Sequence, residues 1–426
     1  MTRVAFEGAY DDVPSQTAAG QPLARIAHGF TGKQDPSRKQ VTLSLSVAAD
    51  GALPAWYRVA DGNAADTRAY LAHLTAMRTY LHLEQPLVVG DSKLITRANQ
   101  LGFCRVGAHF IGPTSLSAAD RAAVQARWAA GDAWHRLDLP VAGAKPKPAA
   151  GRYWGLEQSD VLADPEQETT YALRRLFVQS LDDRRAARHQ RAKDLARARR
   201  ALWTIRHRLG RPAYRDRATV QRKVSEAIAR VRPFVQVTIR PAARGLDVRW
   251  RLHHAALREE AQCDGLYALV TNLAADAATA PDIFRHYKEQ SLVEGRFRAV
   301  KHPPLQVRPL WLHQPQRIES LIFVVMVALF LFALIEREAR RVVRQSGQVF
   351  RGVRAEGRDR LPVTATQLVE AFAPLSLVKQ RLRLGPEIAT VLAPTTLSPP
   401  QAQILERLGL MAPDAYLHPA VTLHPI

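Results

Sequence analysis

The chain has 426 residues, enough for two to four domains with hydrophobic cores, because domains usually span roughly 100–200 residues. Hydrophobic residues make up 47% of the chain, which excludes general disorder. Lys and Arg outnumber Asp and Glu by 60 to 39, giving a formal net charge of +21, and 50 of these basic residues are arginines. The planar arginine fork suits bidentate contact with phosphate, so the charge predicts a nucleic-acid partner.

The first part of the chain alternates strand-like and helix-like segments. Its predicted elements are a strand at 3–6, a hairpin of strands 41–47 and 53–59, a helix starting at Asp66 or Thr67, a strand at 85–91, a helix at 93–101 and a strand at 106–111. This order is that of a ribonuclease H-like fold, in which acids at strand ends gather at one edge of a mixed sheet. Asp91 closes one of these strands.

The middle of the chain carries most of the charge. Strand-like segments at 153–162 and 169–180 precede residues 184–232, which contain 17 Lys or Arg and three acids. Their apolar spacing is helical and is interrupted at Gly210-Arg211-Pro212. A solvated helical face is the alternative, but a net charge of +14 in 49 residues favours contact with a polyanion, because self-repulsion would otherwise cost stability. Strands at 234–240, 246–254 and 265–271 follow.

A helix is predicted over 282–301. At about 100° per residue, Tyr287, Gln290, Glu294, Arg298 and Lys301 fall on one face, which combines a phenol, an amide, a carboxylate and two cations. Taken alone, Glu294 would be interpreted as a surface acid paired with Arg298.

The pattern Tyr287-x2-Gln290-x3-Glu294-x6-Lys301 resembles the Tyr-x2-Arg-x3-Glu-x6-Lys signature of DDE transposases of the insertion-sequence-four type. Gln290 departs from the Arg of many members and lacks its phosphate-matching charge. Four further segments are similar to segments of the same family: Val88-Val89-Gly90-Asp91, Gly62-Asn63-x2-Asp66, Phe6-Glu7-Gly8 and Asp264-Gly265-Leu266-Tyr267. The resemblance covers roughly residues 1–335.

The resemblance implies an α/β protein with a ribonuclease H-like mixed sheet, a large α+β insertion between the second and third catalytic acids, and a C-terminal helical region. The expected domains are 1–114 (first part of the core), 115–262 (insertion with basic helices at 184–232), 263–335 (second part of the core with the signature helix) and 336–426 (helical tail).

The resemblance also implies a function and a site. Asp91 and Glu294 would be catalytic ligands of Mg²⁺ or Mn²⁺, and Tyr287, Gln290, Arg298 and Lys301 would contact DNA. Phosphodiester cleavage with two ions about 3.5–4 Å apart requires shared ligands, so the two carboxylates are expected within about 4–8 Å of each other. Helix capping explains Asp66, to which no chemistry is assigned, and isolated histidines such as His73 are expected to be structural.

The expected protein is a transposase that cleaves and joins double-stranded DNA at inverted-repeat ends and target sites, as a homodimer. Alternatives are a catalytically dead, nucleic-acid-binding remnant of a transposase and an unrelated arginine-rich RNA-binding protein.

Bacterial cytoplasm, on the nucleoid, is the expected location. The N-terminus lacks a secretory signal, and two cysteines, Cys104 and Cys263, are too few for a disulfide framework. The apolar run 321–335 is shorter than the roughly 18–20 residues of a membrane span, so a buried core helix is predicted, with a span as the alternative.

The first acid of the resembling family has no counterpart in the chain. The family pattern Asp-x-Thr-x3-Phe-Glu matches Thr2-x3-Phe6-Glu7 from its Thr onward, which places the Asp immediately before Met1. We therefore expect an N-terminal truncation that removes one metal ligand, with weak metal binding and slow cleavage. Asp11 and Asp12 are the nearby substitutes, but their context is that of a loop.

Overall fold

The computed structural model describes residues 2–6, 10, 16, 22–29, 38–64, 66–132, 134–137, 152–242, 245–301, 305, 312, 314–354, 362–384, 387–411 and 422–425. Glu7, Asp11 and Asp12 lie outside the described residues. Packing divides the chain into two compact units: unit 1 comprises residues 1–84, 140–147 and 288–426, and unit 2 comprises residues 85–139 and 148–287. The protein belongs to the mixed α/β class.

Unit 1 contains two small antiparallel sheets and several helices. Its elements are β1 (Thr2–Ala5), β2 (Gln40–Val47), β3 (Pro54–Ala60), α1 (Asp66–Leu81), the second half of α7 (Ala280–Lys301), α8 (Pro315–Ser346), α9 (Ala365–Ala371), β12 (Leu377–Leu384), β13 (Glu387–Pro394), α10 (Pro399–Leu408) and β14 (Thr422–Pro425). The sheets have the orders β1-β2-β3 and β12-β13-β14. The predicted hairpin is confirmed as β2–β3, whose turn needs Gly51 at φ 72°.

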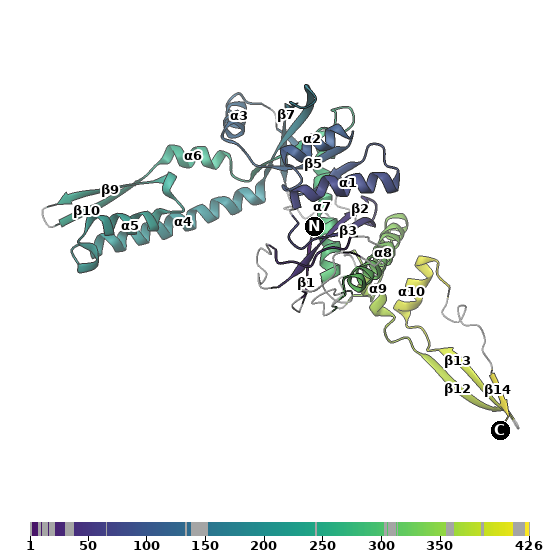
Figure 1. Ribbon diagram of the computed structural model, residues 1–426. Coiled ribbons are helices and arrows are strands. Elements are labelled where there is room, and N and C mark those ends of the chain that lie inside the picture. Colours follow the sequence, from purple (N-terminus) through teal and green to yellow (C-terminus); the bar gives the residue numbers. More distant parts are fainter. Residues whose placement is uncertain are drawn as a thin grey trace. The chain divides into compact units, whose positions relative to one another are not determined.

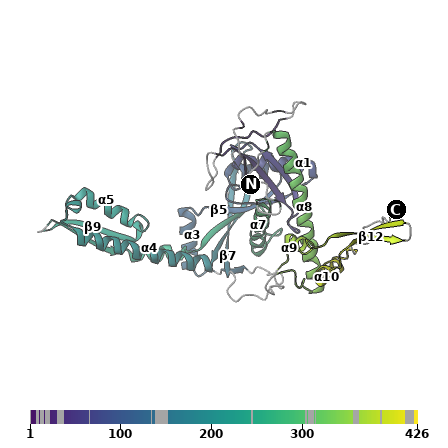
Figure 2. The same ribbon diagram turned by 90° about the horizontal axis from the view of Figure 1, so that it is seen from below.

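The main core of unit 1 forms where α8 packs against the first sheet. Val41 and Leu43 of β2 lie in one cluster with Ile322 and Leu329 of α8, together with Val300 of α7. The C-terminal end of α8 packs instead with α9 and α10 (Figure 2). By length and composition α8 could also cross a membrane, although core helices of soluble proteins meet the same criterion. One side of α8 is buried in the core, as predicted for residues 321–335, and the other side is exposed.

The helical tail expected over 336–426 also contains strands. The end of α8, α9 and α10 are helical, but β12 and β13 form an antiparallel hairpin to which β14 adds. The sequence of β12, Leu377 to Leu384, alternates cations with Leu only in its second half, so its period-two pattern is short.

Unit 2 contains a six-stranded mixed sheet and a separate two-stranded sheet of β9 and β10 (Figure 1). Its elements are β4 (Leu87–Val89), α2 (Arg97–Arg105), β5 (His109–Thr114), α3 (Ala118–Ala129), β6 (His135–Leu137), β7 (Tyr153–Asp164), β8 (Thr169–Ser180), α4 (Leu181–Arg208), α5 (Arg217–Ile228), β9 (Val235–Ala242), β10 (Gly245–Leu252), α6 (His254–Gln262), β11 (Leu266–Thr271) and the first half of α7. The sheet order is β4-β5-β11-β8-β7-β6, with β4 and β5 parallel and the other pairs antiparallel.

The predicted order of strands and helices up to β5 is confirmed, but the bounds of three elements are wrong. The strand predicted at 85–91 is β4, which covers only Leu87–Val89 and ends two residues before Asp91. The predicted helix at 93–101 and strand at 106–111 are α2 and β5, displaced by four and three residues. The displacement arises because Thr96, whose side chain accepts from the Asn99 N–H, caps α2 and leaves residues 91–95 as a turn. Among the described residues, β1–β3 and β4–β5 belong to different sheets, so a ribonuclease H-like arrangement stays a proposal.

His73 of α1 makes the stability of unit 1 depend on pH. The ring is buried, its Nε2 lies 2.8 Å from Ser46 Oγ, and burial lowers the pKa of His73 to about 4. The pKa of His73 in the folded state lies below its unfolded value of about 6.5. The contribution of neutral His73 to the stability of unit 1 is therefore fully present above pH 6.5 and is lost as the pH falls toward 4. We expect unit 1 to lose about 2 kcal/mol between pH 7 and pH 5, measured by hydrogen exchange of α1 and β2 peptides. The same measurement on His73→Gln should show little of this loss, and an equal loss in both proteins would contradict the assignment.

Candidate functional site

Asp91 lies in unit 2, two residues after the end of the parallel strand β4. Its Oδ1 accepts a hydrogen bond from the Lys93 N–H at 3.0 Å, and its carbonyl accepts one from the Leu94 N–H. Gly90 precedes it, and a Cβ there would come within 2.8 Å of the Leu94 side chain, which would have to shift. Asp91 therefore shapes the turn after β4 but does not cap α2, and its side chain is half-buried.

The signature residues lie on the continuous helix α7, so their spacing on one helical face is real. In unit 2, Tyr287 packs beside the cluster of Ile283 and Phe284, with its ring 6.1 Å from that of Tyr267. Gln290, Glu294, Arg298 and Lys301 belong to unit 1. Glu294 and Arg298 are exposed, and Gln290 and Lys301 are half-buried.

The described residues do not by themselves form a complete two-metal site. Carboxylate oxygens suit Mg²⁺ or Mn²⁺, and Asp91 and Glu294 are of the required type. They fall in different units, however, and the described part of the chain holds no group of three Asp, Glu, His or Cys residues able to bind one cation. The predicted convergence of Asp91 and Glu294 stays a prediction.

The predicted basic segment forms a lobe with its own core, here called the basic lobe and defined as α4, α5, β9 and β10 (Figure 1). Leu202 of α4, Val220 and Val224 of α5, and Val248 of β10 are buried together. The predicted break is confirmed, since α4 ends at Arg208 and α5 starts at Arg217. Apolar residues at helical spacing thus form the inside of the lobe and leave the cations outside.

Several arginines of the basic lobe form no ion pair with a carboxylate of the described residues. Arg199, Arg200 and Arg217 are exposed, and no carboxylate of the described residues lies within salt-bridge distance of any of the three. The positive charge of the lobe also affects Tyr214. A hydrogen bond from Arg208 and the nearby cations hold the pKa of the Tyr214 hydroxyl below its usual value. This surface is electropositive, as a phosphate-binding surface requires.

A groove of about 980 Å³ opens on the basic lobe between α4 and β10. Arg199, Arg200 and Trp203 line it from α4, and Trp250 and Arg251 line it from β10. Trp203 is 57% exposed and stacks on the His207 ring, with a centroid distance of 3.7 Å. Exposed aromatic rings among arginines suit contact with both phosphates and bases.

The basic lobe is anchored to the sheet through Asp264, in the segment Asp264-Gly265-Leu266-Tyr267 that resembles the transposase family. Asp264 is buried and forms ion pairs with Arg191 and Arg188 of α4, the latter at 3.7 Å. Gly265 has φ 68°, and a Cβ there would come within 2.4 Å of the Ser180 carbonyl, so only glycine fits. Asp264 therefore uses its charge to hold α4, and Arg188 and Arg191 are partly neutralised.

The groove residues Trp203, Trp250 and Arg251 were not predicted from the sequence. The available signal was the spacing of Trp203, three and four residues after Arg200 and Arg199, which places the three on one side of a helix. Trp250 and Arg251 come from a strand about fifty residues later in the sequence and gave no such signal. No protein-family model matches the chain, and no curated protein matches it.

Proposed function

We propose that the chain is a DDE-type transposase that cleaves double-stranded DNA at inverted-repeat ends and joins it to a target, as a homodimer using Mg²⁺ or Mn²⁺. The proposal rests on α7, a single helix that presents Tyr287, Gln290, Glu294, Arg298 and Lys301 at the spacing of the resembling signature. Asp91, two residues after the end of β4, supports the same interpretation. A ribonuclease H-like arrangement of the catalytic part belongs to this proposal.

Each group has a role in the proposal. Asp91 and Glu294 would provide carboxylate oxygens to the cation, which supplies Lewis-acid chemistry when bound. Arg298 and Lys301 would hold DNA phosphates, with Tyr287 and Gln290 as further contacts. The basic lobe would supply most of the binding free energy through release of counterions from DNA.

Nucleic-acid binding without cleavage is the second candidate function. The groove favours it, because Trp203 among exposed arginines can stack on an unpaired base of DNA or RNA without any metal. Binding to inverted-repeat DNA without cleavage would identify a catalytically dead transposase remnant. Tighter binding to structured RNA than to DNA would identify an RNA-binding protein.

Nicking of a supercoiled plasmid that carries the inverted repeats tests the catalytic proposal. We expect slow cleavage that depends on Mg²⁺ or Mn²⁺ and falls by a further factor of about 100 or more in Asp91→Asn and in Glu294→Gln, because loss of a metal ligand costs more than loss of its supporting groups. DNA affinity should change little. The measurement is the initial rate of nicking at saturating protein.

Glu289→Gln provides a matched control on the same helix, since residue 289 points about 140° away from residue 294. It should nick like the unaltered chain. Equal nicking by all four proteins would exclude Asp91 and Glu294 as ligands, and metal-independent nicking would exclude the reaction class.

A further inference from the structure

The strands β9 and β10 form a two-stranded ribbon with one covered and one open face. The covered face is apolar, and Val237, Val248 and Trp250 on it pack in the core of the basic lobe. Six polar residues alternate with the apolar ones and lie on the open face: Gln236, Thr238, Arg240, Asp247, Arg249 and Arg251. All of them are exposed except Asp247, which is half-buried. The open face is therefore a polar surface with a net positive charge.

The register of the ribbon arranges these polar residues in facing pairs: Gln236 with Arg251, Thr238 with Arg249, and Arg240 with Asp247. Successive pairs are two residues apart along the strands, which corresponds to about 6.8 Å. Two base-pair steps of duplex DNA cover the same distance, because each strand advances by about 3.4 Å per nucleotide along the helix axis. The major groove, about 12 Å wide, admits a two-stranded ribbon. Each pair of side chains can therefore meet every second base pair.

Arg249 is held by a neighbouring acid on the open face. Its Nε donates to Asp247 Oδ2 at 2.7 Å, although the Arg249 side chain is 75% exposed. Neither Nη group of Arg249 forms a hydrogen bond with the described residues. Two such donors suit the O6 and N7 acceptors that guanine presents in the major groove. Because Asp247 already restricts the guanidinium group, less side-chain entropy is lost when that group contacts a base.

The residues beside Arg249 add other chemistry to the open face. Gln236 accepts a hydrogen bond from Arg251 Nε through its Oε1 at 2.7 Å, and its amide nitrogen can still donate. Glutamine suits adenine in the major groove, and the methyl group of Thr238 suits the methyl group of thymine. Arg251 also lines the groove of the basic lobe, where it is placed to contact phosphate. The ribbon thus carries side chains that distinguish bases next to one that holds the backbone.

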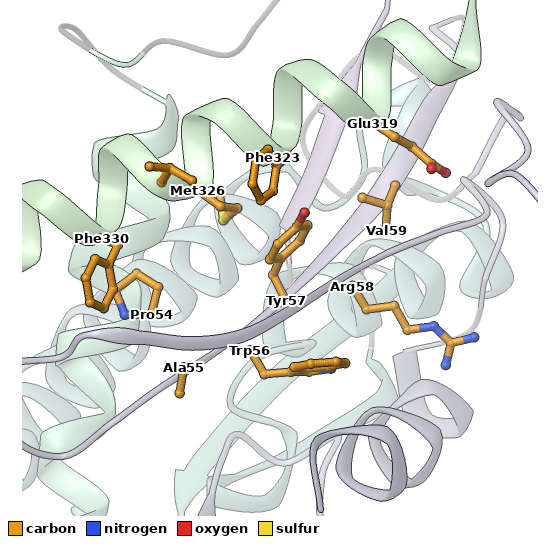
Figure 3. Close-up of a pocket in the computed structure, with 11 residues that line it drawn as sticks. Pro54, Ala55, Trp56, Tyr57, Arg58, Val59, Glu319, Phe323, Met326 and Phe330 are labelled. Atoms are coloured by element: carbon orange, nitrogen blue, oxygen red, sulfur yellow. The ribbon is translucent and has the colours of Figure 1, made fainter. Parts of the chain in front are cut away.

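Unit 1 also has a groove, but its chemistry does not suit a polyanion. It measures about 530 Å³ and lies between α8 and β3, where Phe323 faces Tyr57 (Figure 3). Among the described residues that line it, Arg58 is the cation and Glu319 is the acid, and most of the others are apolar. One charge of each sign gives no net attraction to DNA. Charge therefore favours the basic lobe, with its ribbon, as the surface that meets DNA.

We propose that the open face of β9 and β10 lies in the major groove of double-stranded DNA and reads its sequence, with Arg249 on a guanine. Arg199 and Arg200 of the neighbouring groove then hold the DNA backbone, and the ribbon selects the site. Double-stranded RNA does not fit, because its major groove is too deep and narrow for side chains to read. The inference rests on the DNA partner of the proposed function but not on cleavage, since base reading needs no metal.

Selection of bound sequences from a pool of randomised DNA duplexes, by the full chain in EDTA, tests the proposal. We expect an enriched motif in which exchanging one G·C pair for A·T weakens binding about 10-fold. In Arg249→Ala the same exchange should have almost no effect. The matched control is Arg222→Ala, because Arg222 is 64% exposed and is ion-paired with Glu226 at 2.8 Å in the same lobe. This control should keep the full discrimination, since the ratio of two affinities does not depend on the charge that both variants lose.

A change in the DNA keeps the test valid if the Arg249 variant does not fold. Replacing the selected guanine by 7-deazaguanine removes the N7 acceptor from the major groove and leaves base pairing intact, so the unaltered chain should bind several-fold more weakly. Equal binding of the two duplexes would overturn the proposal.

Three further results would also overturn it: the absence of any motif, a motif whose discrimination survives in Arg249→Ala, and tighter binding of structured RNA than of the selected duplex. A motif read by Arg249 without metal-dependent nicking would support the ribbon and contradict the proposed cleavage. The two proposals can therefore fail separately.

Discussion

Replacing Glu336 by alanine should destabilise unit 1 by about 3–5 kcal/mol, because it leaves a buried arginine without its carboxylate. Arg296 and Glu336 are joined at 2.7 Å, and their side chains are only 8% and 11% exposed. Arg296 also donates to the carbonyls of Gly51 and Ala52, so it cannot leave the interior without breaking the β2–β3 turn contacts. The measurement is hydrogen exchange of peptides from α8 and from the second half of α7, which belong to unit 1.

Two further variants test whether the unpaired buried charge of Arg296 causes the loss of stability in Glu336→Ala. Asp50→Ala removes an exposed ion pair with Arg337 in the same region and should leave the stability almost unchanged. Arg296→Met combined with Glu336→Leu removes both buried charges and should be less damaging than Glu336→Ala alone. If Glu336→Ala changes the stability of unit 1 as little as Asp50→Ala does, Arg296 reaches solvent in the variant and the buried ion pair does not stabilise the fold.

Neutralising Arg199, Arg200 and Arg251 should weaken DNA binding roughly 500-fold at 0.1 M salt, for all duplex sequences alike. These arginines line the groove of the basic lobe, and each lost phosphate contact lowers the slope of log affinity against log salt by about 0.9. Three lost contacts therefore reduce the slope by roughly 2.7. The measurement is a fluorescence-anisotropy titration of Arg→Gln variants at several salt concentrations.

The control changes the same net charge elsewhere. Arg25, Arg344 and Arg351 are exposed arginines of unit 1, and their replacement by glutamine should alter affinity and slope only slightly. If both triple variants lose the same affinity, the net charge of the chain attracts DNA and the groove is not a binding site. Circular dichroism should be unchanged in both, because none of these side chains lies in a hydrophobic cluster.

Local patterns in the sequence predict much of the fold. Alternation around Asp50-Gly51 predicts β2–β3, and apolar residues at helical spacing predict α4, α5 and α7. The helix α3 was missed although Ser117 and Asp120 form a capping box, which is a visible signal of a helix start.

Long-range relations are what the sequence does not reveal. Arg296 resembles the surface cations beside it on α7, and its burial depends on a turn 245 residues earlier and an acid 40 residues later. The same holds for the candidate site, because spacing along α7 predicts which residues share a face but not what meets Glu294. The distance from Glu294 to Asp91 depends on tertiary structure, for which a single sequence carries no local signal.

The position of β11 in the sheet of unit 2 has a consequence for folding during synthesis. β11 lies between β5 and β8 and pairs with both, yet it follows β8 by nearly ninety residues. Until Thr271 has left the ribosome, β4–β5 and β6–β7–β8 are separate halves, each with an unpaired edge. The basic lobe, whose contacts are local in sequence, can fold in that interval, because local contacts form fastest. Translation that pauses before residue 266 would therefore prolong the exposure of two open strand edges, the state in which edge-to-edge aggregation begins.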